Sequence, residues 1–476
     1  MAESAPTPGS ISSAVAYPQD WHLHPGPVLR SPQLLDLPHE TLFDICLHLD
    51  HQALANVTQA CRALHAITNS EHFWKRLCAM LESGPGFQQS LFKSDQKKSF
   101  NDLQRYTRNM LRVHDGWLSP SPPNFRTRQV KSMLLWNNYE LLPGSRWLFG
   151  VLIDGRVCIL DLDAESATYH ILLATSHPQD SVLTKFKIFV SEGNHSYFRV
   201  ALYNTDCRDS KSTRICIYQI EQQIGGFQVT PLTVIWDLAR SHFRGCVELS
   251  ERYIVQCCYL LNGSNDDAPA VLQLRRYSND STVPRRYIEK QLADLGWAGA
   301  FFLPNDCLGL FRRSSVEIYS IHETSSTVMP DLVPLHCIPS NCNPIFSSRP
   351  FIGRYGTHLV GIHQNTVKRV SISHDVTVQP TVETLGALNL EPNYDTRHTK
   401  FGPLASVYCE NMTKVDIATY NVSSFYFPKF RSFHLDLSDR YIGGRITAVA
   451  GLDDHNGRIV LEPFGRERGF VVMDIM

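Results

Sequence analysis

The chain has 476 residues, of which 43% are hydrophobic and 19% charged, and its formal net charge is −1. This length suggests about two to four domains, or one large repeat domain beside a small one. The apolar content is that of a globular protein, and the balanced charge excludes a chain whose whole surface is built to bind nucleic acid or an anionic membrane.

Residues 1–33 are rich in Ser, Pro and Ala and show little apolar periodicity, which predicts a disordered tail. They lack the basic start and continuous apolar core of a secretory signal. No apolar run in the chain approaches the ~20 residues that a membrane-spanning helix needs. We therefore expect a soluble, intracellular protein, in the cytoplasm or the nucleus.

Residues 34–82 predict a cluster of short helices. Leu42, Ile45, Cys46 and Leu49 recur at helical spacing and form one apolar stripe. Asp50 is expected to cap the next helix, because its side chain can accept from the first free N–H groups. Helices this short are not stable alone, so they must bury their stripes against each other or against a partner.

Residues 83–129 are interpreted as a linker that contains one helix, at about residues 99–117. Ser99 and Asp102 have the spacing of a capping box at its start. The prolines of the "SPSPPN" segment at 119–124 end it, since proline removes a backbone donor and fixes the backbone angle.

From residue 130 to residue 476 the apolar period changes from helical to alternating. Short segments rich in β-branched and aromatic residues are separated by turn residues, and Asp154–Gly155 is a strong hairpin signal. A similar strand–turn–strand pattern recurs roughly every 45–55 residues, which is typical of a β-propeller with about four strands per blade. Seven blades fit best, and a pair of β-sandwiches is the alternative.

No catalytic pattern rises above background. The sequence contains no nucleophile elbow, no phosphate-binding loop and no H-E-x-x-H zinc motif. Asp453, Asp454 and His455 are interpreted as a polar hairpin tip rather than a site. The 13 cysteines form no C-x-x-C pair and are interpreted mainly as small apolar residues. We expect no enzymatic activity, no cofactor and no metal.

The order of features in residues 34–78 resembles the F-box. The matching positions run from a Leu-Pro corner to an aromatic, basic and leucine ending, namely Leu37, Pro38, Glu40, Leu42, Ile45, Leu49, Asp50, Leu54, Val57, Cys61, Arg62, Leu64 and Phe73–Leu77. Ala63 departs from the aromatic residue that often follows Cys-Arg in this family. The chain as a whole is similar to fungal F-box proteins with degenerate propellers.

The resemblance implies partners. F-box proteins bind the Skp adaptor of cullin-RING ubiquitin ligases and present client proteins through a second domain. Cys61 and Trp74 would mainly support the fold of the module. By motif position, the apolar contacts to the adaptor would be Leu37, Pro38, Ile45, Leu49, Leu54 and Val57.

Three functions remain open at this point. The first is a substrate receptor of a Skp–cullin–F-box ubiquitin ligase, in which the propeller binds an unidentified protein client. The second is an adaptor-bound scaffold with no role in degradation. The third is a hydrolase built on the propeller, which lacks an acid–base or metal constellation in the sequence. Client contacts are expected on loops such as 206–213, 262–270 and the stretch near 385–400.

Overall fold

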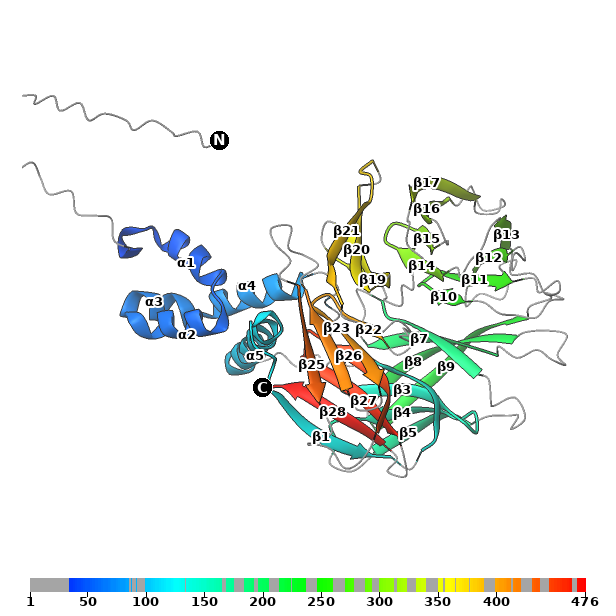
Figure 1. The fold of residues 1–476 in the computed structure, drawn as a ribbon, viewed down its shortest axis with the longest axis horizontal. Helices are drawn as coiled ribbons and strands as arrows, with labels where there is room; N and C mark the ends of the chain where they lie inside the picture. Colours follow the sequence, from blue (N-terminus) through cyan, green and yellow to red (C-terminus); the bar gives the residue numbers. More distant parts are fainter. Residues whose placement is uncertain are drawn as a thin grey trace, which may run out of the picture.

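The computed structural model describes most of the chain from residue 34 onward (Figure 1). The described residues are 34–84, 87, 91, 99–132, 134–164, 168–174, 184–191, 196–204, 214–223, 225–236, 246–259, 270–277, 287–292, 299–311, 315–322, 331–339, 350–353, 356–363, 365–375, 377–388, 399–411, 414–420, 430–436, 445–464 and 469–476. The tail predicted at residues 1–33 lies outside them.

The first part of the described chain is helical. Its elements are η1 (Leu34–Asp36), α1 (His39–Leu47), α2 (His51–Ala60), α3 (Arg62–Thr68), α4 (Glu71–Glu82) and α5 (Phe100–Leu118). Side chains cap three of these helices at the N-terminus. Asp50 accepts from the backbone N–H of Ala53 at 2.6 Å, Ser70 accepts from Phe73, and Ser99 accepts from Asp102 at 3.2 Å.

The capping pair at the start of α5 was predicted from its spacing. The Ser99 hydroxyl also donates to the Asp102 carboxylate at 2.7 Å, so the two side chains hold each other as well as the helix end. None of the helices in the described part of the chain combines the length and hydropathy required to cross a bilayer.

The strands form seven antiparallel sheets of four strands each, arranged in a ring (Figure 1). The first strands of neighbouring blades contact one another, so they lie nearest the ring axis. Blades 1 to 3 contain β2 (Trp136–Leu141), β3 (Trp147–Leu152), β4 (Val157–Asp161) and β5 (Thr168–Leu173); β6 (Thr184–Phe189), β7 (Tyr197–Asn204), β8 (Arg214–Gln223) and β9 (Gly226–Trp236); β10 (Val247–Leu249), β11 (Tyr253–Tyr259), β12 (Ala270–Arg276) and β13 (Tyr287–Leu292).

Blades 4 to 7 repeat the same order of strands. They contain β14 (Gly299–Leu303), β15 (Cys307–Phe311), β16 (Ser315–His322) and β17 (Asp331–Pro339); β18 (Phe351–Ile352), β19 (Gly356–His363), β20 (Thr366–Ser373) and β21 (Thr381–Ala387); β22 (Lys400–Phe401), β23 (Ala405–Asn411), β24 (Lys414–Thr419) and β25 (Arg431–Asp436); β26 (Arg445–Asp453), β27 (Arg458–Phe464), β28 (Gly469–Ile475) and β1 (Phe125–Lys131).

The prediction of a helical N-terminal module followed by a seven-bladed propeller is therefore confirmed, and the alternative of two β-sandwiches is wrong. A sandwich would need strands paired into two large facing sheets. Here each group of four strands forms its own sheet, and apolar side chains fill the space between consecutive sheets. One apolar cluster lies between each pair of neighbouring blades around the whole ring.

The last blade is built from both ends of the propeller sequence. β1 pairs with β28 along its full length, from Phe125 opposite Ile475 to Lys131 opposite Gly469. The predicted boundary at residue 130 falls inside this strand. The sequence pattern did not indicate the pairing, because it joins segments more than 300 residues apart.

Arg458 reinforces the closure of the ring. Its guanidinium lies 2.5 Å from the Asp474 carboxylate within blade 7, and 2.8 Å from the Asp163 carboxylate of blade 1. It also donates to the Ser145 main-chain oxygen at 2.7 Å. With only 12% of its side chain exposed, Arg458 links the last blade to the first through partly desolvated charges.

Arginines near the start of a blade's second strand make similar bridges elsewhere. Arg199 donates to the main-chain oxygen of Glu251 in the next blade, and Arg252 pairs with Asp306 of the blade after that at 3.2 Å. An arginine at this position therefore recurs in several blades. The periodicity of apolar residues does not reveal it, because the repeated residue is charged.

Candidate functional site

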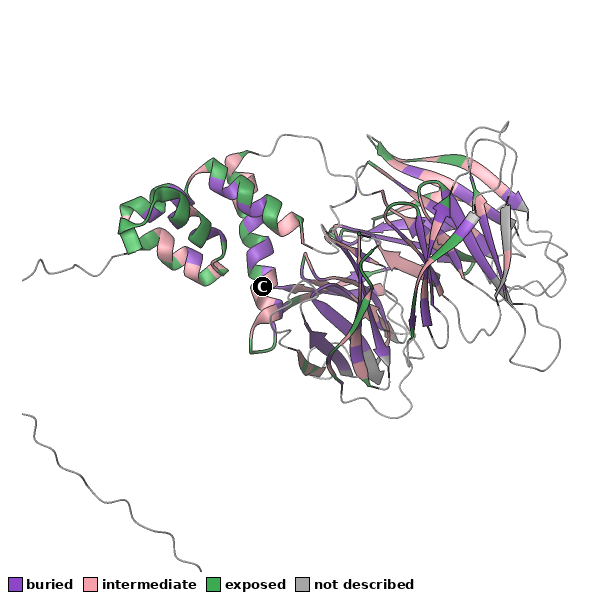
Figure 2. Ribbon diagram, turned by 90° about the horizontal axis from the view of Figure 1, so that it is seen from above, coloured by how far each residue is buried: buried purple, intermediate pink, exposed green. Residues whose placement is uncertain are grey.

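The helical module exposes large apolar side chains on η1, on the Leu-Pro corner and on α1, and these elements lie apart from the ring of blades (Figures 1 and 2). Leu34 and Leu35 are 52% and 50% exposed, Leu37 is 37% exposed and Ile45 is 38% exposed. We call these four residues the distal apolar set. Pro38 lies among them and is also exposed, at the N-cap position of α1. Single exposed apolar residues are ordinary, but several within one short segment are typical of an interaction site.

The distal apolar set is exposed because the module already has a complete core beneath it. The core side chains come from all of the first four helices and from α5: Leu42, Cys46, Leu47, Leu54, Leu64, Ile67, Phe73, Trp74, Leu77 and Leu111. Trp74, which the family resemblance assigned a supporting role, is 1% exposed, and Cys61 packs against the same core. In helix α1 the buried Leu42 and Cys46 point inward, and Ile45 points to solvent.

The six residues predicted to contact an adaptor are thus divided. Leu37, Pro38 and Ile45 are exposed, whereas Leu49 and Val57 are half-buried against the core. Leu54 is 4% exposed and is part of the core itself, so its side chain offers almost no surface to a partner in this structure. Its place in the contact set does not agree with this burial, because Leu54 belongs to the same buried cluster as Leu64 and Phe73.

Leu34 and Leu35 were not among the predicted contacts. They form η1 directly before the Leu-Pro corner, and none of its residues is buried. The run "LLDLP" is the signal that could have identified them, since three leucines in four residues cannot all face the core of so short an element.

Helix α5 joins the helical module to the propeller. Leu111 belongs to the core of the module, while Val113 and Trp117 of the same helix belong to the apolar cluster between blades 6 and 7. The Asp115 carboxylate accepts from the backbone N–H of His51 at 2.6 Å, which fixes the start of α2 to α5. One helix is therefore shared by two cores, and its two faces set the orientation of one domain against the other.

Two glycines allow this close approach. A Cβ at Gly116 of α5 would lie 2.9 Å from Cγ2 of Ile475, and one at Gly457 would lie 2.9 Å from Cγ1 of Val113. Gly457 also has φ +70°, which a residue with a side chain adopts only at a cost. The helix and the turn between β26 and β27 can pack together because neither carries a side chain at these points.

Asp454 lies in that same turn and connects three elements. Its main-chain oxygen accepts from Trp117 Nε1 of α5 at 2.6 Å, and its carboxylate accepts from the backbone N–H groups of Leu404 and Ala405 in blade 6 at 2.5 and 3.1 Å. Burial raises the pKa of the Asp454 carboxyl. The sequence predicted a polar hairpin tip here. The turn is present, but Asp454 is 2% exposed and acts as a structural junction.

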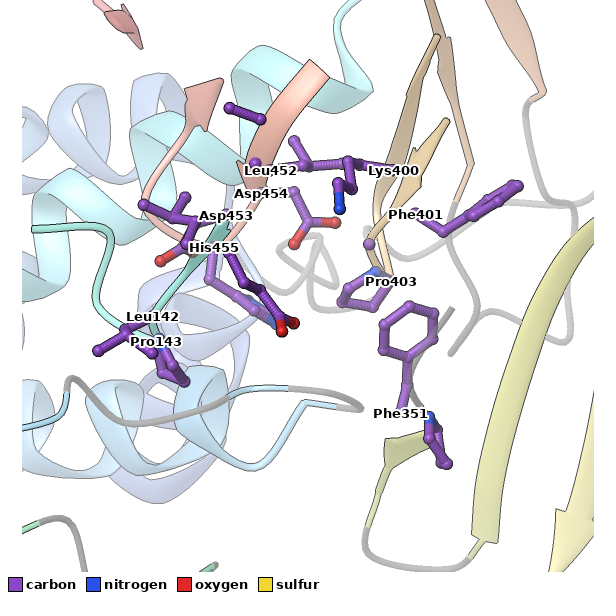
Figure 3. Close-up of a pocket in the computed structure, with 16 residues that line it drawn as sticks. Leu142, Pro143, Phe351, Lys400, Phe401, Pro403, Leu452, Asp453, Asp454 and His455 are labelled. Atoms are coloured by element: carbon purple, nitrogen blue, oxygen red, sulfur yellow. The ribbon is translucent and has the colours of Figure 1, made fainter. Parts of the chain in front are cut away.

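A cavity of about 150 Å³ opens beside this junction near the ring axis (Figure 3). Blades 1, 5, 6 and 7 all contribute to its wall, and apolar side chains such as Phe351, Phe401 and Pro403 face charged ones. The His455 ring packs edge-on against Phe87 with ring centres 5.2 Å apart, and its Nε2 is buried with no hydrogen-bond partner. Within the described ranges, no group of three or more His, Cys, Asp or Glu side chains is arranged to hold a metal ion.

The loops on which client contacts were predicted are largely outside the described residues. This applies to 206–213 entirely, to 262–270 except its last residue, and to 389–398 of the stretch near 385–400. Those predictions therefore stay as predictions.

Comparison with known proteins identifies the helical module. A family model described as F-box-like matches residues 34–80. The comparison with curated proteins gives no match.

Solved structures resemble the propeller part at low identity. The β-propeller domain of Cps50 (Swd1) from Myceliophteria thermophila is 12% identical, with 74% of this chain and 100% of that chain covered and a TM-score of 0.44. The WD40 domain of SCAP from fission yeast is 12% identical, with 71% and 81% covered and a TM-score of 0.36. The structure of U3-55K is 11% identical, with 74% and 98% covered and a TM-score of 0.38.

The likeness to these structures concerns the fold alone. The chain combines an F-box-like domain at residues 34–80 with a seven-bladed β-propeller, and this architecture fits an F-box protein with a propeller.

Proposed function

We propose that this chain is the substrate-recognition subunit of a Skp–cullin–F-box ubiquitin ligase. The F-box-like domain binds the Skp adaptor and, through it, a cullin-RING ligase, and the propeller binds a protein client. The chain itself carries out no ubiquitin transfer, which belongs to other subunits. We place its work in the cytoplasm or the nucleus.

The observation that supports adaptor binding most directly is the exposure of the distal apolar set. Its four side chains belong to η1, the Leu-Pro corner and α1, and these elements lie apart from the ring of blades (Figure 1), so a partner can reach them without disturbing the propeller. Apolar anchors that enter pockets of a partner supply most of the free energy of binding in many interfaces. We assign the adaptor contacts to Leu37, Pro38 and Ile45, add Leu34 and Leu35, and place Leu49 and Val57 at the margin.

The way α5 is held supports the receptor role. An adaptor bound to α1 and a client bound to the propeller would be separated by a helix whose two faces are both packed. This arrangement gives the client a defined position relative to the ligase. A flexible linker would instead spread the client over many positions.

The test is affinity capture of the full chain from its native cell under proteasome inhibition. The variant Leu37→Ala/Pro38→Ala and the variant Ile45→Asp should each lose the Skp adaptor and the cullin while the propeller stays folded. Ile171→Asp is the matched control, because Ile171 is an exposed apolar residue (48%) on β5 of the propeller. It should retain both partners.

The outcomes separate the candidate functions. Capture of the adaptor together with a cullin, and accumulation of captured clients when the chain is depleted, supports the ligase receptor. Capture of the adaptor without a cullin supports a scaffold with no role in degradation. Unchanged capture of the adaptor by both F-box variants would overturn the proposal.

A further inference from the structure

Cys246 and Cys257 lie directly opposite each other in blade 3. The register of β10 and β11 places Val247 opposite Gln256, and the next pair outward is Cys246 and Cys257. The backbone N–H of Cys257 donates to the main-chain oxygen of Cys246 at 2.9 Å, which extends the ladder to this pair. Opposite residues of an antiparallel pair carry their side chains on the same face.

The spacing of such a pair is compatible with a disulfide. Hydrogen-bonded opposite residues have Cα atoms about 5.5 Å apart, inside the range of about 4.4–6.8 Å that disulfides span. The Cys246 thiol is also in hydrogen-bond contact with the Cys257 thiol. Both residues are thiols in this structure. The sulfur atoms therefore face each other without any change in strand register.

The two thiols differ in accessibility. Cys257 is 0% exposed and belongs to the apolar cluster between blades 3 and 4, whereas Cys246 is partly exposed at the margin of the same cluster. Of the two residues, Cys246 therefore lies nearer to solvent. Cys257 is sheltered from solvent but lies next to any product formed on Cys246.

The surroundings also favour the thiolate of Cys246. The hydrogen bond with the Cys257 thiol lowers the pKa of Cys246, and the backbone N–H of Ala300 and the ammonium of Lys187 act in the same direction, against the opposing effects of burial and of Glu248. Lys187 and Glu248 form an ion pair at 2.6 Å beside this thiol. By contrast, burial raises the pKa of Cys158 to about 11. Thiolate character and access together decide which cysteines are oxidised.

We propose that Cys246 and Cys257 are a redox pair that a hydroperoxide converts reversibly into a disulfide between β10 and β11. The Cys246 thiolate attacks one oxygen of the hydroperoxide, its O–O bond breaks, and the sulfur becomes a sulfenic acid as the leaving oxygen takes a proton. The Cys257 thiol then attacks the Cys246 sulfur, the S–O bond breaks, and water leaves with the thiol proton. A dithiol such as dithiothreitol reverses the reaction.

The experiment uses the full chain with hydrogen peroxide as the hydroperoxide. The protein is oxidised, the remaining thiols are blocked with N-ethylmaleimide, and linked peptides are identified by mass spectrometry with and without dithiothreitol. The Cys258→Ser background ensures that a linkage through the adjacent cysteine is not counted. We expect a Cys246–Cys257 linkage that dithiothreitol removes, formed about tenfold or more faster than oxidation of Cys158.

Variants test the order of the two steps. In Cys257→Ser, a dimedone probe should label a sulfenic acid at Cys246, whereas the parent chain should show little label because the disulfide forms first. Cys246→Ser should leave Cys257 unoxidised. Absence of the linkage in the parent chain, or faster oxidation of Cys158 than of Cys246, overturns the proposal even if a variant fails to fold. The outcome is independent of adaptor binding.

Discussion

Trp117 of α5 donates its indole N–H to the main-chain oxygen of Asp454, and this 2.6 Å hydrogen bond joins residues 337 positions apart. The Trp117 ring is 0% exposed and packs with Phe125 at the start of β1, so one side chain touches both the closing strand and the turn between β26 and β27. This contact is where the F-box-bearing helices are anchored to the ring.

Trp117→Phe should therefore weaken the anchor. The smaller ring keeps part of the apolar contact but leaves the buried oxygen of Asp454 without its donor, which costs about 1–3 kcal/mol. The midpoint of thermal unfolding should fall, and limited proteolysis should cut near α5 sooner. Tyr169→Phe on the outer strand of blade 1, where the side chain is 45% exposed, is the control and should change neither measurement.

Substitutions at Leu54 and Ile45 should affect different properties, the stability of the module in the first case and adaptor binding in the second. Leu54→Ala removes a side chain that is 4% exposed and should cost about 2–5 kcal/mol of unfolding free energy. Ile45→Ala removes one that is 38% exposed; it should leave stability nearly unchanged and weaken adaptor capture. Denaturant unfolding and affinity capture on the same two proteins measure both effects. Equal losses of stability would show that the module packs differently from this structure.

Arg458→Ala should weaken the contact between the last blade and the first and lower the stability of the propeller. The variant loses the pairs with Asp474 and Asp163, and because both carboxylates are partly exposed we expect a loss of about 1–3 kcal/mol rather than the value for a fully buried pair. Tryptophan fluorescence during urea unfolding would measure it. Arg105→Ala is the control, since its pair with Asp102 lies on an exposed helix surface and contributes little. A loss no larger than that of the control would mean that β1 alone closes the ring.

The burial of His358 predicts that the stability of the folded chain depends on pH. Its ring is 9% exposed, and burial, with the nearby Arg369, lowers the pKa of His358 to about 4. The unfolded chain takes up a proton near pH 6.5 and the folded chain does not, so stability is complete above that pH and is lost as the pH falls toward 4. At pH 5 the loss is about 2 kcal/mol for this group.

The measurement is the unfolding midpoint at pH 7 and at pH 5. His358→Gln, which can still bond to the Ser371 hydroxyl that lies 2.9 Å from His358 Nδ1, should show a smaller difference between the two pH values than the parent chain. An identical pH dependence in both proteins would contradict the assignment to His358.

Local signals in the sequence predicted the elements well. The predicted caps at Asp50 and Ser99 act between residues three positions apart, and the hairpin at Asp154–Gly155 is set by a glycine with φ +81°. The number of blades followed from a spacing that repeats along the chain. Such features depend on neighbouring residues, so they can be seen without knowing the fold.

The sequence predicted only in part which residues of the candidate site are exposed. The F-box pattern identified the module and its exposed corner at Leu37 and Pro38, but it did not distinguish the inward-facing Leu54 from the outward-facing Ile45. Both are apolar residues at helical spacing, and the period alone does not say which side of a short helix faces its neighbours.

The sequence by itself determined that a short helical module precedes a ring of strands, because the periods of 3.6 and 2 are properties of local segments. Only the tertiary structure decided that β1 closes the last blade, that α5 belongs to two cores, that Asp454 is buried, and that Cys246 faces Cys257. The physical reason is the same in each case. These contacts join side chains whose distance in space is set by how the blades and helices pack, and a linear pattern carries no measure of that distance.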